Sequence, residues 1–367
     1  MNIIEITGEP ILHGGQEKFI ENIVGNIDMT DLHIDVLTPY QCENPSFQEL
    51  LHSKGGEVFH FDLPFRIGKS RRMLLRPIQD FLQGHHYDVA HIHSGSISVL
   101  AYAALAARHA KVKKIIVHSH STGIESLKHS IIRAVFAPVL NANATCFLAC
   151  SREAGLTKFT KSVVRHRLQV VRNGISIDTY RRNPEKRAEI RSRLGIPEKC
   201  FVIGHVGRFS TEKNHAFLID LFSQIRQRSP DCRLLLVGDG ERSAEIHQQV
   251  EALSLVPYVI FTGNVDNVQD YYQAMDCFVL PSLYEGFSLV TLEAQAAGLP
   301  CVISDGVPED VVIGAHVKKI CLSQPQMWME TILACSDLET VDNTQAIRTA
   351  GYDVRDTAAV IRELYLQ

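Results

Sequence analysis

The chain has 367 residues, of which 45% are hydrophobic and 21% charged, and its formal net charge is −4. This composition is that of an ordinary globular protein, and it excludes both a disordered chain and a bundle of membrane helices. The longest apolar runs fall far short of the ~20 residues that a membrane-spanning helix needs. A chain of this length predicts two domains, because single hydrophobic cores stop growing at roughly 250–300 residues.

The charge is distributed unevenly. Residues 1–180 contain 19 Lys and Arg against 16 Asp and Glu, whereas residues 181–367 contain 18 against 25. This imbalance is too small to indicate a nucleic-acid-binding surface. Nine cysteines without a CxxC pair indicate reduced thiols, and residues 1–6 lack the features of a signal peptide. We therefore expect a cytoplasmic protein, and we also consider peripheral contact with the inner face of the membrane.

Short apolar runs alternate with polar, helix-like stretches along the chain, which predicts parallel sheets covered by helices. The predicted strands are residues 3–7, 34–38, 58–61, 89–92, 115–117, 146–149, 202–206, 234–237, 259–261, 277–280 and 301–303. These eleven strands are too many for one doubly wound sheet. They predict an α/β fold with two sheets.

A further strand-like run at 168–171 closes the first half, and a polar region at 181–195 leads to a new strand at Phe201. We predict two Rossmann-like, doubly wound domains facing a cleft. The N-terminal domain covers 1–175, the C-terminal domain covers 176–350, and a C-terminal helix at 351–367 packs back on the N-terminal domain. The segment 318–349 shows no clear pattern. Ligands of such sheets bind beyond the carboxyl ends of the strands.

The strongest motif is residues 281–300, PSLYEGFSLVTLEAQAAGLP. A buried strand ends there in a loop, and a helix is expected to begin near Ser288. The free N–H groups and the dipole at this helix start suit a diphosphate. Glu285 lies in the loop and Glu293 in the helix, so the two carboxylates cannot share one helical face. They suit hydroxyl recognition at separate points rather than a shared metal ion.

This Glu-x7-Glu stretch resembles the signature of retaining glycosyltransferases with the two-domain GT-B fold, in particular glycosyltransferase family 4. The resemblance covers nearly the whole chain. It implies that Glu293 binds the nucleotide ribose and that Glu285 approaches the donor sugar. The backbone of four consecutive residues would contact the diphosphate and the sugar hydroxyls: Gly286, Phe287, Ser288 and Leu289. Taken singly, either glutamate could equally be a solvated acid.

Arg208 and Lys213 follow the strand at 202–206 in the segment GHVGRFSTEKN. A leaving nucleoside diphosphate needs fixed positive charge where its negative charge develops, and these two cations can supply it. The resemblance assigns both residues to the phosphates. The chain contains no Asp-x-Asp pair, the main feature of metal-dependent, single-domain glycosyltransferases. We therefore expect no metal or other cofactor.

Gly238 and Gly263 each end a predicted strand, in VGDGE and FTGNV. They resemble the family's glycine turns near the nucleotide base, and the resemblance assigns base contact to the backbone of Asn264 and Val265. Equally, both glycines could serve only to permit tight turns. The first of these segments fails as a dinucleotide fingerprint, because Ser243 stands where the third glycine belongs.

His13, Gly14 and Gly15 follow the first strand and open a helix. Adjacent glycines let backbone amides approach a phosphate or sugar closely. The resembling family places its Gly-Gly loop against the donor diphosphate or the acceptor. Gly14 and Gly15 are therefore candidate acceptor-side residues, and Gly15 is also a candidate donor-binding residue.

His118 and His120 end a strand-like run, so both imidazoles should lie on the same side of the sheet. The resemblance maps the family's active-site histidine to His120, in contact with the donor hexose, with His118 as the acceptor-side alternative. With His91 and His93, however, the two HxH pairs could offer four nitrogens to zinc. That interpretation predicts a zinc-dependent hydrolase.

The segment 65–76, FRIGKSRRMLLR, is basic and partly apolar. Each cation could contribute on the order of 1 kcal/mol to contact with anionic lipid headgroups, which would suit a lipid-linked acceptor. A solvated loop and helix start is the other interpretation. Gly68-Lys69-Ser70 within it is no phosphate-binding loop, because Leu63 occupies the position of the required first glycine.

The sequence therefore predicts a retaining hexosyltransferase that moves sugar from a nucleotide-diphosphate sugar, with a UDP-sugar favoured, to a glycan or lipid-linked acceptor in polysaccharide synthesis. The predicted catalytic residues are His120, Arg208, Lys213 and Glu285. Residues 305–310 lack the family's usual glycine pair, a departure that resembles the branch found in bacterial capsular or exopolysaccharide clusters. The alternatives are the zinc hydrolase and a non-catalytic sugar-nucleotide-binding subunit.

Overall fold

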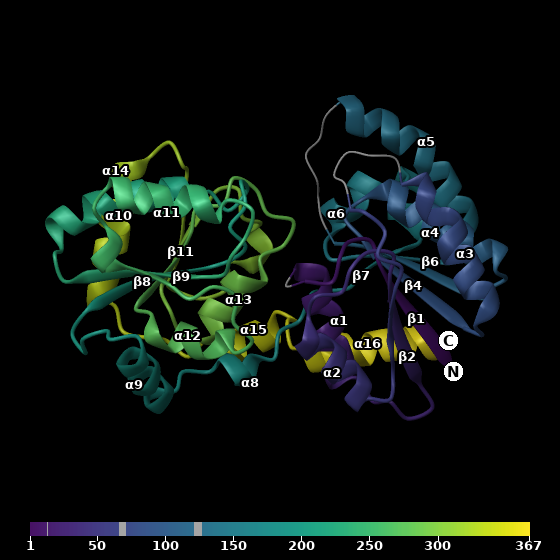
Figure 1. The fold of residues 1–367 in the computed structure, drawn as a ribbon, viewed down its shortest axis with the longest axis horizontal. Helices are drawn as coiled ribbons and strands as arrows, with labels where there is room; N and C mark the ends of the chain where they lie inside the picture. The colour runs from purple at the N-terminus through teal and green to yellow at the C-terminus, as the bar shows by residue number, and fades with distance from the viewer. Residues whose placement is uncertain (13, 66–70, 121–126) are drawn as a thin grey trace. The chain divides into compact units, whose positions relative to one another are not determined.

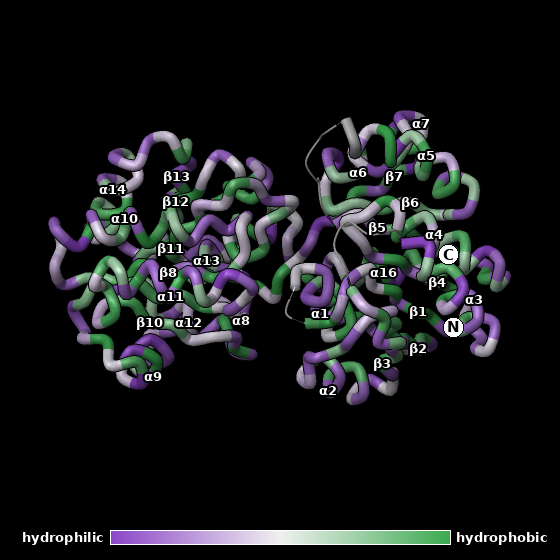
Figure 2. The backbone as a smooth tube through the Cα atoms, turned by 45° about the horizontal axis from the view of Figure 1, so that its top comes forward, coloured by the Kyte–Doolittle hydropathy of each residue, from purple (hydrophilic) through white to green (hydrophobic). Residues whose placement is uncertain are grey.

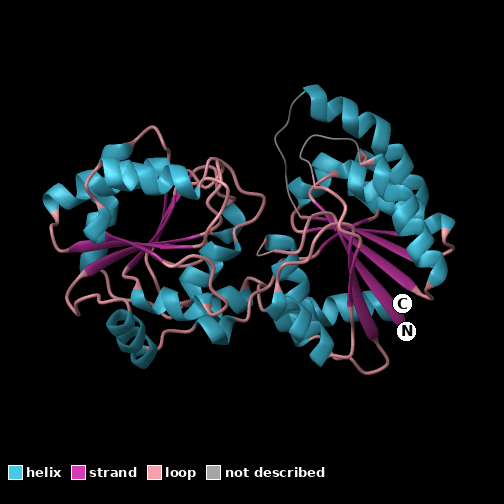
Figure 3. Ribbon diagram, in the orientation of Figure 1, coloured by secondary structure: helices cyan, strands magenta, loops and turns pink. Residues whose placement is uncertain are grey.

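The computed structural model describes residues 1–12, 14–65, 71–120 and 127–367. The chain divides into two units, the first containing Met1–Gly174 and Val354–Gln367 and the second containing Ile175–Asp353. Each unit is built around one parallel sheet with helices on both faces (Figures 1 and 3). The N-terminal part of the first unit ends at Gly174, one residue before the predicted domain end at 175. The C-terminal helix belongs to the first unit.

The first unit contains seven parallel strands in the order β3-β2-β1-β4-β5-β6-β7. Their bounds are β1 Asn2–Thr7, β2 His33–Thr38, β3 Val58–His60, β4 Val89–Ser94, β5 Lys114–Ser119, β6 Cys146–Ala149 and β7 Leu168–Val170. The central strands are continuous apolar runs, because a parallel sheet is covered on both faces. Register places His91 opposite Glu5, and two residues further along the strands it places His93 between Thr7 and His118.

The helices of the first unit are α1 Gly15–Asn26, α2 Pro45–Ser53, η1 Arg72–Leu74, α3 Leu75–Gly84, α4 Ile97–His109, α5 Leu127–Asn143, α6 Arg152–Lys158, α7 Lys161–His166 and α16 Val354–Leu366. The first and last of these, α1 and α16, pack on each other, and their apolar faces join the core with residues of β1, β2 and β4. The opposite face carries α3, α4 and α5 (Figure 1). Ser151 caps α6 by accepting a hydrogen bond from the Ala154 N–H at 3.1 Å.

The second unit contains six parallel strands in the order β10-β9-β8-β11-β12-β13. Their bounds are β8 Phe201–Val206, β9 Cys232–Val237, β10 Val259–Phe261, β11 Cys277–Leu280, β12 Cys301–Ser304 and β13 Val317–Ile320. Counted from β8, this is the Rossmann order 3-2-1-4-5-6. The first unit has the same order with β7 added at its edge.

The helices of the second unit are α8 Ile177–Tyr180, α9 Pro184–Arg193, α10 His215–Arg228, α11 Ser243–Ala252, η2 Val256–Tyr258, α12 Val268–Ala274, α13 Leu289–Ala296, η3 Glu309–Val311, α14 Pro325–Ala334, η4 Cys335–Asp337 and α15 Thr344–Thr349. One core lies between the sheet and α10, α11 and α14, and a second lies between the other face and α8, α12, α13 and α15. The central strands are hydrophobic, whereas α9 is largely hydrophilic (Figure 2).

The prediction of two Rossmann-like domains is confirmed, and a strand lies at each of the eleven predicted runs. The sequence reading missed β13, because Lys318 and Lys319 interrupt its apolar pattern. Lysines of this kind are common on edge strands, where they oppose pairing with another chain. Among the described residues, no helix is long and apolar enough to cross a membrane. All nine cysteines lie in the described part of the chain and are free thiols.

Candidate functional site

The structure brings Lys213 and Glu285 together in the second unit, beyond the carboxyl ends of the neighbouring strands β8 and β11. The Lys213 Nζ donates to Glu285 Oε1 at 2.7 Å, and the Ser282 hydroxyl donates to the same oxygen at 2.6 Å. The two ion-pair side chains are only 16% and 10% exposed. Two backbone hydrogen bonds, from Leu283 N to Glu212 O and from Glu285 N to Gly306 O, hold the loop.

Arg208 lies at the end of β8 and forms a more exposed ion pair. Its Nε donates to Glu241 Oε2 at 3.0 Å, and the two side chains are 59% and 54% exposed. An exposed pair of this kind contributes ~0–1 kcal/mol. An incoming phosphate, which guanidinium groups bind through two parallel hydrogen bonds, can therefore displace Glu241 at little cost.

Gly238 serves the close packing of two loops at this end of the sheet. Its φ is +129°, and an added Cβ would lie 2.2 Å from the carbonyl oxygen of Gly207. Its N–H donates to the carbonyl of Gly263 at 2.9 Å. The tight-turn interpretation of Gly238 therefore has a structural basis. Base contact by Asn264 and Val265, on the neighbouring turn, stays a prediction.

Glu293 lies in the second turn of α13 and is 4% exposed. The Tyr180 hydroxyl donates to Oε1 at 2.9 Å, and the Tyr272 hydroxyl donates to Oε2 at 2.8 Å. Burial and the neighbouring carboxylate raise the pKa of Tyr272 well above its ordinary value, so it remains a donor. A carboxylate oxygen can accept more than one hydrogen bond. The tyrosines therefore orient the Glu293 carboxylate.

The sequence reading missed both tyrosines, because they lie in α8 and α12, far from Glu293 in the chain. It placed the start of α13 well: the helix begins at Leu289 with Ser288 as its N-cap residue. The Ser288 hydroxyl is 2.7 Å from the Thr291 hydroxyl and makes no capping bond to the backbone. The N–H groups of a first helical turn have no acceptor within the helix, so Ser288 and Leu289, at the N-cap and the first helical position, can present amides to an anion.

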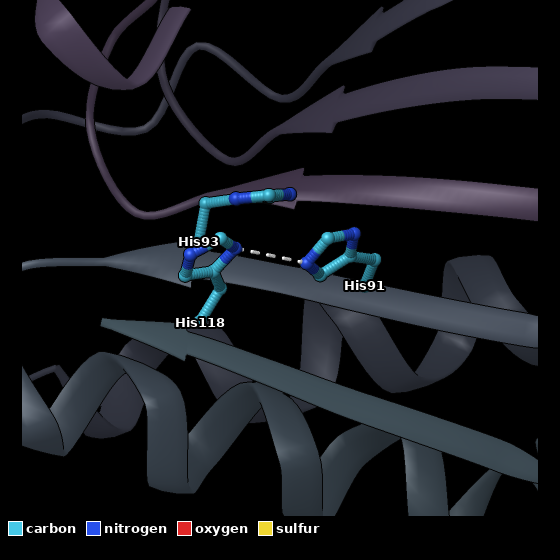
Figure 4. A group of neighbouring side chains, drawn as sticks. All are labelled: His91, His93 and His118. Carbon is cyan, nitrogen blue, oxygen red and sulfur yellow. Dashed lines mark hydrogen bonds between the residues drawn. The ribbon is translucent and has the colours of Figure 1, made fainter. Parts of the chain in front are cut away.

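A cluster of buried histidines lies in the first unit. His91 and His93 project from β4 and His118 from β5, and the three rings lie together on one face of the sheet (Figure 4). His91 Nε2 is 3.3 Å from His118 Nδ1. His120, just past β5, places its Nε2 2.8 Å from His93 Nδ1. The prediction that the imidazoles of His118 and His120 share one side of the sheet is confirmed, since their rings stack at 4.2 Å.

Two residues that the sequence reading did not single out complete this cluster: Glu5 of β1 and Tyr365 of α16. Glu5 Oε2 is 2.5 Å from His93 Nε2 and 3.2 Å from His91 Nδ1. The Tyr365 hydroxyl donates to Glu5 Oε1 and lies 2.8 Å from His91 Nδ1. Burial opposes ionisation of Glu5, but the charges and hydrogen bonds of the two histidines outweigh it and hold the pKa of Glu5 well below its ordinary range.

His118 in β5 and His120 just past its end differ in accessibility. His118 is fully buried, with the ring of Phe19 edge-on at 4.9 Å, whereas the His120 side chain is partly exposed. Burial is the main cause, and the neighbouring histidines a second cause, that lowers the pKa of each ring well below its ordinary value. Both are therefore neutral near pH 7. The difference in exposure favours His120 as the residue that a ligand contacts.

Gly14 and Gly15 lie at the start of the twelve-residue helix α1, with Gly14 as its N-cap residue. An added Cβ on Gly15 would meet no atom within 4 Å, so its backbone faces open space. Glu17 folds back on this turn and accepts from the Leu12 N–H at 3.4 Å. Burial raises the pKa of Glu17 to about 7. His13, residues 66–70 of the basic segment and residues 121–126 lie outside the described residues.

Comparisons with known proteins agree with this fold. The family described as "Glycosyl transferases group 1" matches residues 186–348, and "Glycosyltransferase Family 4" matches residues 13–179. The putative glycosyltransferase EpsF of Bacillus subtilis is 32% identical over 365 residues, which cover 96% of this chain and 93% of that protein. The Escherichia coli UDP-Gal:alpha-D-GlcNAc-diphosphoundecaprenol alpha-1,3-galactosyltransferase is 29% identical over 231 residues, 61% of this chain and 59% of that protein.

Solved structures support the architecture. HepE of Anabaena, in complex with UDP and glucose, superposes with a TM-score of 0.79 at 24% identity and covers 99% of both chains. Sucrose-phosphate synthase from Thermosynechococcus elongatus gives a TM-score of 0.76 at 17% identity over 100% of this chain and 99% of that one. The fold and family predicted from the motif at 285–293 are confirmed: the chain is a glycosyltransferase of the GT-B fold and belongs to glycosyltransferase family 4.

Proposed function

We propose that this enzyme transfers a hexose from a UDP-sugar, with retention of the anomeric configuration, to a glycan or lipid-linked acceptor in polysaccharide synthesis. The choice of UDP is supported by HepE, whose structures contain UDP or UDP-glucose. The choice of acceptor is supported by the E. coli relative, whose name specifies a sugar on diphosphoundecaprenol. Contact of the basic segment 65–76 with an anionic membrane is part of this proposal.

The observation that carries the proposal is the ion pair between Lys213 and Glu285. Its 2.7 Å hydrogen bond holds a half-buried ammonium group at the loop beside the start of α13. As the bond between the anomeric carbon and the diphosphate oxygen breaks, negative charge develops on that oxygen. Lys213 and Arg208 stabilise this charge, and preorganised cations act most strongly where water is partly excluded.

The proposal also assigns the remaining donor contacts to the second unit. Glu293, held by its two tyrosines, accepts from the ribose hydroxyls. Glu285 approaches the sugar, and the backbone of Asn264 and Val265 contacts the base. Gly286 to Leu289 direct their amides at the diphosphate.

The transfer step needs no enzyme nucleophile. The acceptor hydroxyl oxygen attacks the anomeric carbon on the face that the diphosphate leaves, and its proton passes to the departing phosphate oxygen. His120 contacts the donor hexose, and Gly14 and Gly15 lie on the acceptor side. No metal is required, because Arg208 and Lys213 supply the positive charge that a metal would otherwise provide.

A ligand panel tests the donor class. In thermal unfolding with UDP-, GDP- and ADP-sugars, a UDP-sugar at 100 times its Kd should add ~2.7 kcal/mol of stability, and the others should add far less. Preferential stabilisation by a GDP- or ADP-sugar would contradict the choice of UDP. Proton NMR of the first product formed decides retention, since an inverted anomeric coupling would contradict it.

A chelator tests the absence of a metal. Transfer from the UDP-sugar should proceed at an unchanged rate after dialysis against EDTA. Loss of activity that Mg²⁺, Mn²⁺ or Zn²⁺ restores would show that a metal supplies the charge assigned to Arg208 and Lys213.

A further inference from the structure

Within the first unit, a line of hydrogen bonds connects the C-terminal helix to His120. The Tyr365 hydroxyl in the last turn of α16 bonds Glu5 Oε1, and Glu5 Oε2 bonds His93 Nε2 at 2.5 Å. His93 Nδ1 in turn bonds His120 Nε2 at 2.8 Å. Tyr365, Glu5 and His93 are buried. We refer to these four residues as the His120 relay.

The chemistry of each group sets the direction of every proton in the relay. Ionised Glu5 can only accept hydrogen bonds. Tyr365 keeps its proton, because burial and the charge of Glu5 raise its pKa well above its ordinary value. His93 is neutral near pH 7, since burial and then His91 lower its pKa to about 4 against the opposing effect of Glu5. Its single proton therefore lies on Nε2, which faces the carboxylate.

In this arrangement His93 Nδ1 carries no proton and can only accept a hydrogen bond. His120 Nε2 therefore has to be the donor. A neutral imidazole carries one N–H, and His120 is neutral near pH 7. Its Nδ1 therefore carries no proton. This nitrogen is buried and has no hydrogen-bond partner among the described residues. Buried polar atoms without partners are uncommon and require an explanation.

We propose that Glu5, His93 and Tyr365 are positioning residues that hold His120 in the Nε2–H tautomer, so that its Nδ1 accepts a hydrogen bond from a hydroxyl of the donor sugar. The contact with the donor rests on the proposed function, whereas the tautomer is a property of the free protein. Hydrogen bonding at one imidazole nitrogen commonly determines what the other can do. His120 then selects a donor group that carries a proton and rejects one that can only accept.

His93 of the relay could also be considered as a metal ligand, because His91, His93 and His118 can each place one nitrogen within 4.8 Å of the others (Figure 4). Two nitrogens bound to tetrahedral zinc at ~2.0–2.1 Å lie roughly 3.3 Å apart. Within the relay, the 2.8 Å between His93 Nδ1 and His120 Nε2 is shorter and is a normal hydrogen-bond length, whereas His91 Nε2 and His118 Nδ1, outside the relay, are 3.3 Å apart. Hydrogen bonding therefore explains the contact between His93 and His120 better than coordination does.

The direct test observes the tautomers in the free, full-length protein. Long-range proton–nitrogen NMR at pH 7 on ¹⁵N-histidine-labelled protein should show a protonated Nε2 and an unprotonated Nδ1 for both His93 and His120. Assignment uses the signals lost in His93→Gln and His120→Gln. An Nδ1–H tautomer of His120 in the native protein would overturn the proposal. So would stoichiometric zinc or another transition metal in the purified protein.

Glu5→Gln provides a second arm of the NMR experiment. The amide has nearly the shape of the carboxylate but can donate as well as accept. The proposal expects a substantial fraction of His120 to convert to the Nδ1–H tautomer in this variant. Unchanged His120 tautomers in a folded Glu5→Gln protein would show that Glu5 does not set them, and the role of Glu5 would be rejected.

A matched pair of tyrosine variants separates positioning from general stability. Tyr87 resembles Tyr365 in that its buried hydroxyl donates to a buried carboxylate of the same unit, Asp35, at 2.8 Å. Tyr365→Phe and Tyr87→Phe should lower the melting temperature similarly. Only Tyr365→Phe should lower kcat/KM, by about tenfold, with UDP-glucose as the probe.

Equal kcat/KM in the two folded variants would overturn the role of Tyr365. If the native protein neither binds nor turns over any UDP-sugar, the proposed function fails, and the NMR experiment still decides whether the tautomer is held by the relay.

Discussion

The candidate groups of the two units handle charge in opposite ways. In the first unit, the His120 relay is buried except for the partly exposed His120 side chain, and its histidines with lowered pKa are neutral near pH 7 around one carboxylate. In the second unit, Arg208 and Lys213 form ion pairs with acids that are at least partly accessible. The second arrangement suits an anion that replaces a carboxylate, and the first suits a neutral hydroxyl.

The same contrast appears between two buried acids of the first unit. Glu5 has a pKa held below its ordinary range by His91 and His93, whereas burial raises the pKa of Glu17 to about 7. Both side chains are almost inaccessible. Hydrogen-bonding and charged partners, rather than burial, therefore decide whether the pKa is lowered or raised. The following predictions test these contrasts, beginning with the largest expected effect.

Lys213→Ala should lower kcat by ~10²–10³-fold, because it removes preorganised charge from the developing diphosphate. Steady-state transfer from the UDP-sugar measures it. Lys186→Ala is the control, because Lys186 forms an exposed pair with Glu189 on α9 of the same unit. If Lys213→Ala retained the native kcat, this result would contradict the assignment of Lys213 to the departing diphosphate.

Glu293→Ala should weaken UDP binding by roughly 10–100-fold, since hydrogen bonds to a charged group are worth ~1.5–3 kcal/mol each. Calorimetric titration measures the Kd. Tyr180→Phe and Tyr272→Phe should each have a smaller effect, of about two- to fivefold, because the carboxylate stays but loses one orienting bond. A larger effect from either tyrosine than from Glu293 would contradict the ribose assignment.

Glu17→Gln should change how stability depends on pH. Below pH 4.5 the carboxyl is protonated in both the folded and the unfolded protein, so its ionisation has no effect. Between pH 4.5 and about 7 the unfolded protein ionises first, so the native protein loses stability as pH rises.

The loss should reach ~2–3 kcal/mol above pH 7. Urea unfolding at pH 5 and pH 8 measures it, and Glu17→Gln should remove this component. Glu21→Gln is the matched control, because Glu21 lies on the same helix in a partly exposed pair with Lys18. If both variants keep the pH slope of the native protein, Glu17 is not the group responsible.

Glu241→Gln should have the smallest effect, lowering thermal stability by less than ~1 kcal/mol, as expected for an exposed ion pair. UDP affinity should stay the same or rise slightly, because Arg208 no longer has to release a carboxylate. A clear loss of affinity would show that Glu241 itself belongs to the donor site.

Much of the fold follows from local patterns. Alternating apolar runs predicted the central strands of both sheets, and among the residues that the structure describes the one missed strand is β13, whose lysines break the pattern at an edge. The motif around Glu285 and Glu293 pointed to the family, and the comparisons confirm it. The sequence did not predict the pairing of Lys213 with Glu285, although both residues follow strands that are neighbours in the sheet.

By itself, the sequence determined the periodicity of the elements and the two Rossmann-like domains, because spacing along the chain encodes local structure. Its motif around Glu285 and Glu293 resembles that of a known family, which identified the family. Only the tertiary structure decided which side chains meet. Tyr365 reaches Glu5 across 360 positions of the chain, and Tyr180 reaches Glu293 across 113. Such contacts depend on strand order and on which sheet face a helix covers, and no local pattern carries that information. The arrangement around His120 and Glu293 therefore became visible only in the folded protein.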